Sequence, residues 1–365
     1  MNKKLFWITV SCFIFSCATK PISKHVFPNE VQKEFSYSGR TEKLNDTTQA
    51  LVSSAAHVIF KTKSDSVTFL IGAKGETHSY VVIEVNGNYF GRFRVERDSV
   101  NRISITLPKH KNYLVGLYKA TEASNGAILF YGVESSNISS AKIKNNASIE
   151  FIGNSITCGF GADTKVIQCG TGTWYDQHNA YLAYGPLVAR RLHANYNLSS
   201  VSGMGIYRNW NDEDTSPVMG DVYATTNLDG NKEHLWNFSD KEKPDLVSIC
   251  LGTNDLSNGD GQKKRKPFDA EKFTSKYIDF VNEIFKRYPK ATLALLTSPM
   301  VSSENNKVLL DCLHKIKAHF DSGHTIAIFE FKPMHPSGCD SHPDLKDHKA
   351  MADQLFPFFT ELLKK

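Results

Sequence analysis

Residues 148–159 read Ser-Ile-Glu-Phe-Ile-Gly-Asn-Ser-Ile-Thr-Cys-Gly, in which an apolar run ends at a glycine followed by small polar residues. Such a run, bounded by a turn signal, is typical of a buried strand in a parallel sheet. Gly153 allows a tight exit from the strand, which would present Ser155 near the N-terminus of the following element. That position favours an anionic intermediate, because a helix N-terminus carries partial positive charge. The stretch therefore predicts an α/β sheet with a serine at the end of a strand.

The segments after this stretch continue the same alternation. Further strand-like runs are NLSSVS, DLVSICLG, TLALLTS and TIAIFEF, and helical patterns such as FDAEKFTSKYIDFVNEIFKRY separate them. A last helix is expected over about residues 345–363. We therefore predict that residues 147–365 form an α/β domain in which helices flank a parallel sheet.

The preceding part of the chain has a different rhythm. Between residues 56 and 134 it consists of short alternating segments rich in β-branched and aromatic residues, such as HVIFKT, SVTFLIGA and NRISITLP. Residues 86–88, Asn-Gly-Asn, are a hairpin signal between two such segments, because asparagine and glycine tolerate positive φ. These features predict a β-sandwich domain over residues 34–146.

Length and charge narrow the class of protein. A chain of 365 residues has room for two packed domains. The formal net charge of +5 comes from 43 basic and 38 acidic residues scattered along the chain, and the one dense basic run, residues 263–266, lies in a polar loop. A nucleic-acid site would need basic residues gathered on one surface with aromatic side chains between them. The sequence therefore argues against a nucleic-acid partner.

The N-terminus is typical of an exported protein. Lys3 and Lys4 precede an apolar run over residues 5–15. That run is too short to span a bilayer but has the length of a signal-peptide core. The sequence therefore predicts export.

The residues after this run predict a lipid anchor. Residues 14–17, Ile-Phe-Ser-Cys, resemble a bacterial lipobox, in which Cys17 would be diacylated and become the first mature residue. We expect residues 1–17 to be a lipoprotein signal peptide and residues 18–33 a polar tether. The mature protein would then be anchored to a membrane, in the periplasm or at the cell surface. A plain secretory signal, in which Cys17 has no role, is the competing interpretation.

Five cysteines remain beyond the signal, which is an odd number. In an oxidising compartment, a bridge between Cys158 and Cys169 would staple the loop after Ser155, whereas Cys250 lies in an apolar run and is expected to be buried. The cysteine spacing does not suggest a zinc site, and the charged clusters do not suggest a cation site. No metal ion or organic cofactor is expected. The five are Cys158, Cys169, Cys250, Cys312 and Cys339.

Polar residues just past the apolar runs are the candidates for chemistry, because ligands bind at the carboxyl ends of parallel strands. Ser155 would act as nucleophile, and His342, directly before the last helix, as its general base. Asn254, just past the run at residues 246–250, would donate a side-chain hydrogen bond to a developing oxyanion. Taken alone, Ser155 is better explained as a helix cap. The combination of all three residues favours catalysis.

Three motifs resemble those of the SGNH hydrolases. Residues 153–155 read Gly-Asn-Ser where many members have Gly-Asp-Ser, residues 252–255 match the asparagine block, and Ser-Gly-Met-Gly at residues 202–205 resembles the glycine block. The resemblance implies a three-layer α/β/α hydrolase domain. It also implies an oxyanion hole, whose donors would be the main-chain amides of Ser155 and Gly203 and the side chain of Asn254. Gly205 is the alternative to Gly203 as a donor.

Longer matches resemble carbohydrate esterase family two. They cover residues 153–159, 202–209 and 338–343, the last reading Gly-Cys-Asp-Ser-His-Pro, and a jelly-roll-like N-terminal β domain also fits that family. The resemblance implies an esterase that removes O-acetyl groups from plant polysaccharides, such as acetylated xylan or glucomannan. It further implies a leaning toward sugar 6-positions. The expected partner is therefore an acetylated polysaccharide or oligosaccharide.

The third member of a triad departs from the common pattern. Many SGNH enzymes carry an acid three residues before the histidine, where this chain has Cys339, whereas Asp340 lies two residues before His342. Within family two, some members orient the histidine with an aspartate, and others orient it with a backbone carbonyl. We assign the orienting role to Asp340 as a hypothesis, the alternative being a Ser-His dyad. Asp255 is expected to cap the loop that it begins and is left out of the catalytic set, and His335 and His348 are expected to be structural or solvent-facing.

Aromatic and polar loop residues leave several roles open. Arg208 and Asn209 would either shape the site or fix its loop. The β domain is expected to pack against the catalytic domain, the alternative being that it binds glycan. Each of three loop tryptophans would either stack on a sugar ring or pack against the core. These are Trp174, Trp210 and Trp236.

Two other functions compete with polysaccharide deacetylation. An SGNH lipase, thioesterase or sialate O-acetylesterase would use the same serine and histidine on a different ester, and a series of acyl chain lengths would separate these enzymes. The second alternative is a catalytically inactive glycan-binding lipoprotein. The presence of Ser155, Asn254 and His342 together argues against inactivity.

Overall fold

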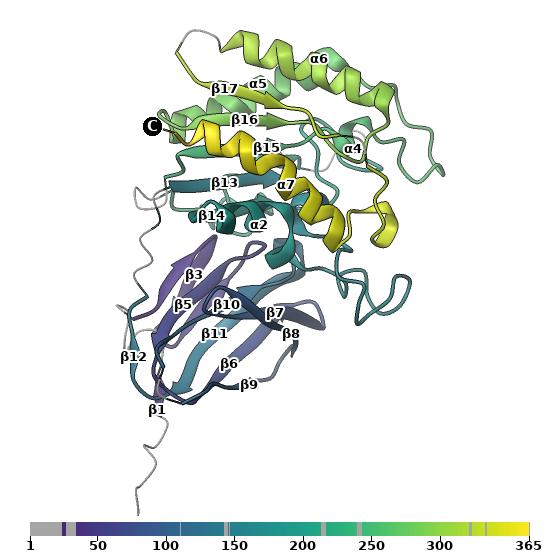
Figure 1. Cartoon of the computed structure of the whole chain (residues 1–365). Coiled ribbons are helices and arrows are strands. Elements are labelled where there is room, and N and C mark those ends of the chain that lie inside the picture. Colours follow the sequence, from purple (N-terminus) through teal and green to yellow (C-terminus); the bar gives the residue numbers. More distant parts are fainter. Residues whose placement is uncertain are drawn as a thin grey trace, which may run out of the picture.

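The computed structural model describes residues 24–26, 34–109, 111–141, 145, 147–212, 217–238, 243–320, 323–332 and 334–364. An all-β domain is followed by an α/β domain, and the two are stacked on one another (Figure 1). The predicted signal peptide with Cys17 lies outside the described residues. In the part of the chain that is described, no helix combines the length and apolar character needed to cross a membrane.

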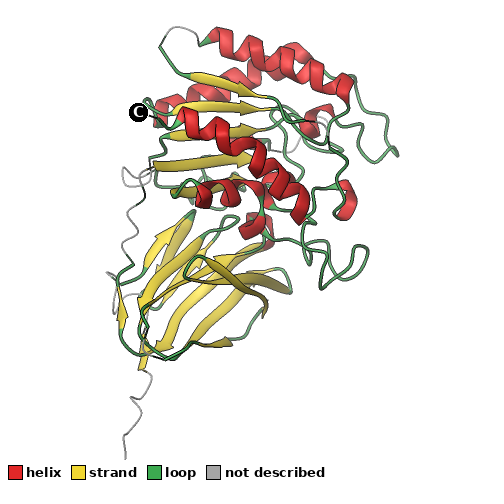
Figure 2. Ribbon diagram, in the orientation of Figure 1, coloured by secondary structure: helices red, strands yellow, loops and turns green. Residues whose placement is uncertain are grey.

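The β domain consists of two antiparallel sheets (Figure 2). Its strands are β1 (Lys24–Val26), β2 (Ser36–Ser38), β3 (Thr41–Asn45), β4 (Thr48–Leu51), β5 (His57–Thr62), β6 (Ser66–Gly75), β7 (His78–Val85), β8 (Asn88–Glu96), β9 (Asn101–Thr106), β10 (Tyr113–Lys119), β11 (Gly126–Ser135) and β12 (Ile138–Ser139), with the 3-10 helix η1 (Ala123–Asn125) before β11. One sheet has the order β3-β4-β11-β6-β9, with β1 paired to β11. The other has the order β12-β5-β10-β7-β8, with β2 paired to β5.

A shared apolar core joins these two sheets. Phe69 and Ile71 of β6, in the first sheet, are fully buried in the same cluster as Val81 and Ile83 of β7, in the second. In each pair the residues are two positions apart, which is the spacing of side chains on one face of a strand. The predicted β-sandwich is confirmed.

The hairpin between β7 and β8 has the turn that its residues favour. Val85 pairs with Asn88, so that only Asn86 and Gly87 form the loop, and their φ angles are 52° and 78°. A two-residue turn with positive φ at both positions matches the twist of the flanking strands, and asparagine followed by glycine adopts it readily. The predicted hairpin is confirmed.

Part of the predicted tether belongs to the β domain instead. Lys24–Val26 forms β1, which pairs antiparallel with the last residues of β11. β4 pairs with β11 only at residues 128–130 of β11. The main-chain groups near the end of β11 are therefore available to pair with another strand. The interpretation of residues 18–33 as a tether throughout is therefore wrong for these three residues.

The α/β domain has a five-stranded, wholly parallel sheet of order β14-β13-β15-β16-β17. Its strands are β13 (Ala147–Gly153), β14 (Ala194–Ser200), β15 (Leu246–Cys250), β16 (Thr292–Leu296) and β17 (Ile326–Phe329). Its helices are α1 (Ser155–Cys158), η2 (Ala180–Leu182), α2 (Tyr184–Arg191), α3 (Met219–Val222), α4 (Thr253–Leu256), α5 (Ala270–Arg287), α6 (Ser303–His319), η4 (Cys339–Ser341) and α7 (Leu345–Leu362).

Helices cover both faces of this sheet. In β16, Leu293 and Leu295 lie in the core that contains buried residues of α5 and α6, whereas Ala294 and Leu296 lie in the core that contains those of α2 and α7. Successive residues of a strand point to opposite faces, so the two helix pairs lie on opposite sides. The predicted three-layer α/β/α domain is confirmed (Figure 1).

Buried polar contacts join the two domains. Arg40 of the β domain is fully buried, and its guanidinium donates to the main-chain oxygens of Thr225 at 2.6 Å and Tyr223 at 2.9 Å. Tyr181 Oη donates to Glu84 Oε2 at 2.6 Å. Because such groups are costly to leave unpaired, these contacts hold the domains in one relative position.

Candidate active site

Ser155 lies at the carboxyl edge of the parallel sheet, where β13 ends and α1 begins. The Asn154 side chain caps α1 by accepting from the Ile156 N–H at 3.2 Å. A Cβ at Gly153 would lie 2.1 Å from Thr157 Oγ1, so the turn out of the strand leaves no room for a side chain. As the first residue of α1, Ser155 has an N–H that no helical carbonyl can accept. The position therefore supplies both a hydroxyl group and a main-chain donor.

His342 meets this serine from the other end of the domain. Its Nε2 lies 2.8 Å from Ser155 Oγ, and its Nδ1 lies 2.9 Å from the main-chain oxygen of Asp340. A carbonyl oxygen can only accept, so Nδ1 carries the proton and Nε2 is the acceptor for the serine hydroxyl. Burial lowers the pKa of His342, although the Asp340 carbonyl opposes this shift. The neutral imidazole is therefore ready to act as a base at neutral pH.

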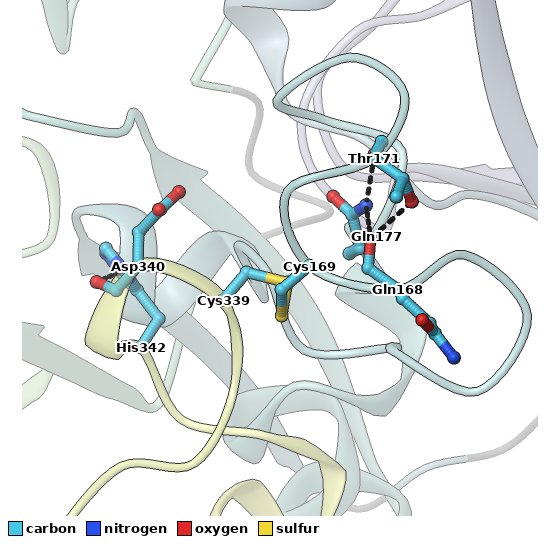
Figure 3. The surroundings of a disulfide bond; sticks show 7 residues. All are labelled: Gln168, Cys169, Thr171, Gln177, Cys339, Asp340 and His342. Carbon is cyan, nitrogen blue, oxygen red and sulfur yellow. Dashed lines mark hydrogen bonds between the residues drawn. A yellow bond between two sulfur atoms is a disulfide. The ribbon is translucent and has the colours of Figure 1, made fainter.

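The orienting group of His342 differs from the one that we predict from the sequence. His342 Nδ1 donates its hydrogen bond to the main-chain carbonyl of Asp340, whereas the hypothesis assigned the acceptor role to the carboxylate. Asp340 has left-handed backbone angles of φ 51° and ψ 41° inside η4, which turn its carbonyl toward the ring. Its side chain is exposed and extends to the other side of the main chain in Figure 3. This geometry is that of a Ser-His dyad supported by a carbonyl.

The three predicted oxyanion donors surround one cleft. Ser155, Gly203 and Asn254 line it together with His342. Asn254 Nδ2 donates one hydrogen to the Met204 carbonyl at 2.8 Å, which leaves the second hydrogen of the amide for a substrate. Gly203 has a φ of 77°, which glycine adopts without strain. The geometry is that of a hole that would hold a developing negative charge.

The structure also distinguishes Gly203 from Gly205, the alternative oxyanion donor. The N–H of Gly205 donates to Asn209 Oδ1 at 3.0 Å, and Gly205 is not among the residues that line the cleft. A Cβ at Gly205 would lie 2.1 Å from the Arg208 carbonyl, so this glycine serves close packing within the loop. The geometry therefore favours Gly203 as the donor.

Asp255 has a larger role than capping the loop that it begins. Its buried carboxylate accepts from the main-chain N–H groups of Ile206 at 3.0 Å, Tyr207 at 2.9 Å and Arg208 at 3.3 Å. Burial raises the pKa of Asp255 to about 6, and these N–H groups oppose the rise. Arg208 Nε donates back to the Asp255 carbonyl at 2.7 Å, so Arg208 fixes the loop. Only the position of Asp255 next to Asn254 signalled this role in the sequence.

Aromatic side chains line the cleft, which has a volume of about 710 Å³. Trp174 and Trp210 are 44% and 48% exposed there. The Phe160 ring lies 4.3 Å from the His342 ring and 5.9 Å from that of Trp174, measured between centroids. By contrast, Trp236 lies over the buried Arg40 guanidinium and is not part of the cleft lining. Two of the three tryptophans therefore remain available to a ligand.

A disulfide bond connects two loops of the site. Cys169 is bonded to Cys339, so the predicted bridge from Cys158 to Cys169 is wrong (Figure 3). Cys158 belongs to α1, where it is fully buried and its Sγ donates to Ser200 Oγ at 3.2 Å. The actual bond joins the loop that carries Trp174 to the turn that carries His342. Buried free cysteines in the described residues are Cys158, Cys250 and Cys312, which agrees with the prediction for Cys250.

The neighbouring histidines do not contribute to the cleft. His335 is exposed, whereas His348 is buried in α7 and its Nδ1 lies 3.3 Å from the Tyr184 nitrogen. Burial lowers the pKa of His348 to about 4. Among the described residues, no three His, Cys, Asp or Glu side chains gather so that they could hold a metal ion.

Two family models match this chain in succession. The model described as Carbohydrate esterase 2 N-terminal matches residues 37–140, and the GDSL-like Lipase/Acylhydrolase family model matches residues 151–321. The chain belongs to carbohydrate esterase family two. The two matches correspond to the β domain and to most of the α/β domain of this esterase.

Relatives of this esterase extend over much of its length. An acetylxylan esterase / glucomannan deacetylase of Cellvibrio japonicus is 28% identical over 258 residues, which are 69% of either chain. The cellulase/esterase CelE of Acetivibrio thermocellus is 28% identical over 345 residues, or 90% of this chain but only 39% of CelE. A solved family two carbohydrate esterase from Clostridium thermocellum, in complex with cellohexaose, is 25% identical with a TM-score of 0.77, covering 90% of this chain and 99% of that one.

The site of this family two esterase has the parts that acyl transfer requires. With His342 Nε2 accepting its proton, Ser155 Oγ can attack an ester carbonyl to form an acyl-enzyme, and the protonated imidazole can then release the alcohol. Water would attack the acyl group in the second half of the reaction, with His342 again as the base. The donors at Ser155, Gly203 and Asn254 would stabilise both tetrahedral intermediates.

Proposed function

We propose that this esterase removes O-acetyl groups from plant polysaccharides, with acetylated xylan and acetylated glucomannan as the first candidates. One observation carries the proposal: the Ser155–His342 pair, at 2.8 Å, opens into a cleft that exposes two tryptophans. Indole faces stack on the apolar faces of sugar rings, and neighbouring polar groups can meet the hydroxyls. Polar groups of this kind in the lining are Ser257, Asn258, Ser302 and Asn305.

The names of the relatives support the same substrate class. The Cellvibrio japonicus relative is an acetylxylan esterase / glucomannan deacetylase, and the solved Clostridium thermocellum relative binds cellohexaose. A chain of linked sugars in such a cleft would bring its acetyl groups to Ser155. We further propose a preference for acetyl groups at sugar 6-positions, which project farthest from the ring and which hexose units such as those of glucomannan carry, whereas xylose units do not.

Acetate release tests this proposal directly. The protein lacking residues 1–17 should release acetate from acetylated xylan or acetylated glucomannan, and Ser155→Ala should abolish the release. Comparison of 6-O-acetylated with 2-O- and 3-O-acetylated oligosaccharides measures the positional preference. If longer acyl esters are hydrolysed while both polymers are untouched, the enzyme is a lipase or thioesterase. No hydrolysis of any ester would favour a glycan-binding protein.

We also propose that the protein is exported and anchored to a membrane through a lipid on Cys17. The support comes from the charged start, the short apolar run and the small residue before this cysteine. Cells that express the full chain should incorporate labelled palmitate into the protein and retain it in the membrane fraction. Cys17→Ala should remove the label and the retention. A labelled Cys17→Ala variant would refute the assignment.

A further inference from the structure

A buried carboxylate of the β domain reaches the glycine block of the active site. Glu122 follows β10 and is fully buried. Its Oε2 accepts two hydrogen bonds from Ser202 of the α/β domain, one from the main-chain N–H and one from the hydroxyl, each at 2.8 Å. The contact therefore crosses the interface between the two domains and ends beside the oxyanion hole.

Ser202 directly precedes Gly203, whose N–H is one of the three oxyanion donors. That N–H lies in the peptide plane shared by the two residues, so the position of Ser202 determines its direction. On the other side, the Gly203 carbonyl accepts from the Trp210 N–H at 2.8 Å. Gly203 itself has a φ of 77° and packs against little, because a Cβ there would meet only Trp210 Cβ, at 4.0 Å. Its orientation thus depends on how its neighbours are held.

Glu122 is itself held firmly. Its Oε1 accepts from Ser124 Oγ at 2.8 Å, and its main-chain carbonyl accepts from the Lys119 ammonium at 2.5 Å. Lys119 is fully buried, and although burial lowers the pKa of Lys119 to about 7, the carboxylate of Glu122 favours its charged form. A main-chain hydrogen bond between the two domains lies close by in the chain: the Ala180 N–H of the α/β domain donates to the Ala120 carbonyl of the β domain at 2.9 Å. Bonds to an ionised carboxylate in such a dry environment are stronger than neutral ones.

We infer that Glu122 is a positioning residue for ester hydrolysis, which directs the Gly203 N–H toward the oxyanion by holding Ser202. The inference rests on the esterase function proposed above. It gives the β domain a part in catalysis as well as in packing. Glu122 does not line the cleft, and its contact with the site is the one to Ser202 of the glycine block, while its charge also raises the pKa of His342.

The separation of kcat from KM tests the inference. The oxyanion forms only in the transition state, so a displaced Gly203 N–H should lower kcat and leave KM nearly unchanged. Loss of one oxyanion donor costs about 10²–10³ in kcat, and a donor that is displaced but still present should cost less. For Glu122→Ala we therefore expect kcat to fall about 10- to 100-fold on 4-nitrophenyl acetate, with KM within about twofold.

A conservative variant and a matched control accompany this change. Glu122→Gln keeps an acceptor oxygen for Ser202 and should recover most of kcat. Glu84→Gln is the control, because Glu84 is also a buried glutamate of the β domain that bonds across the interface, but to Tyr181 and away from the cleft. Its kcat should equal that of the unchanged chain. All variants are compared as full-length chains in mild detergent, with thermal unfolding measured beside activity.

Ser202→Ala removes one of the two bonds and keeps the inference testable where Glu122→Ala does not fold. It should lower kcat in the unchanged chain and in Glu122→Gln, where the contact is kept, and have no additional effect together with Glu122→Ala if the two residues act through one contact. A folded Glu122→Ala with unchanged kcat, or an equal loss in Glu84→Gln, would overturn the inference alone. Failure of the unchanged chain to hydrolyse the ester would overturn the proposed function and, with it, the inference.

Discussion

Replacement of both Cys169 and Cys339 by serine should lower the free energy of unfolding by several kcal/mol. The bond between them spans a sequence separation of 170 residues, which includes most of the α/β domain. For a closed loop of that length, the chain-entropy model gives about 5 kcal/mol at 25 °C, and native disulfides contribute about 2–5 kcal/mol in practice. We therefore expect a loss of about 2–5 kcal/mol.

Urea unfolding followed by far-ultraviolet circular dichroism measures this loss. The double variant and the unchanged chain with added reductant should unfold at the same, lower midpoint, whereas the unchanged chain without reductant should unfold later. Cys312→Ser is the control, because this cysteine is buried but forms no disulfide bond. Reductant should therefore lower the urea midpoint of the control variant as much as that of the unchanged chain. Identical midpoints for the double variant and the oxidised chain would refute the assignment.

The same variant should retain part of its activity. The Cys339 N–H also donates to the Gly161 carbonyl at 3.0 Å, and this contact continues to hold the turn that carries His342. A misplacement of about 1 Å can cost about 10² in rate, so the loss of kcat at a temperature where the variant is folded should not exceed that factor. A complete loss of turnover in the folded variant would contradict this account of the turn.

Three further predictions concern the catalytic groups. Asp340→Asn should keep kcat within about tenfold of the unchanged enzyme, because the orienting carbonyl belongs to the main chain; a fall of about 10⁴, as when a serine triad loses its carboxylate, would restore the triad. Asn254→Ala should lower kcat on 4-nitrophenyl acetate by about 10²–10³, equal to about 2.7–4 kcal/mol, and a loss below about threefold would exclude Asn254 from the oxyanion hole. Activity requires neutral His342, and burial lowers the pKa of this residue below the usual 6.5. We therefore expect kcat/KM to have its full value at pH values above the pKa of His342 in the folded protein and to fall as the pH drops through that pKa. An acid limb centred above pH 6.5 would contradict that shift.

Local patterns predicted much of the fold and several site residues. The strands β13, β15 and β16 are apolar runs because both faces of a parallel sheet are covered by helices. Ser155 and Asn254 follow such runs directly, and strand ends meet at one edge of a parallel sheet. The hairpin at Asn86 and Gly87 follows from residue chemistry alone.

Other features depended on a single backbone angle or on contacts between distant segments. Whether Asp340 orients His342 by its carboxylate or its carbonyl was decided by the left-handed conformation of that one residue. Cysteine spacing could not select Cys339 as the partner of Cys169, because the two are brought together only when the sheet is complete.

The sequence by itself determined which chemical groups this esterase carries and the type of its main strands and helices, because periodicity and turn chemistry act over a few neighbouring residues. Only the tertiary structure decided how those groups are held. Glu122 lies 80 residues before Ser202, and Asp255 lies 49 residues after Ile206. Contacts over such separations arise from the packing of whole layers and leave no periodic signal in the chain.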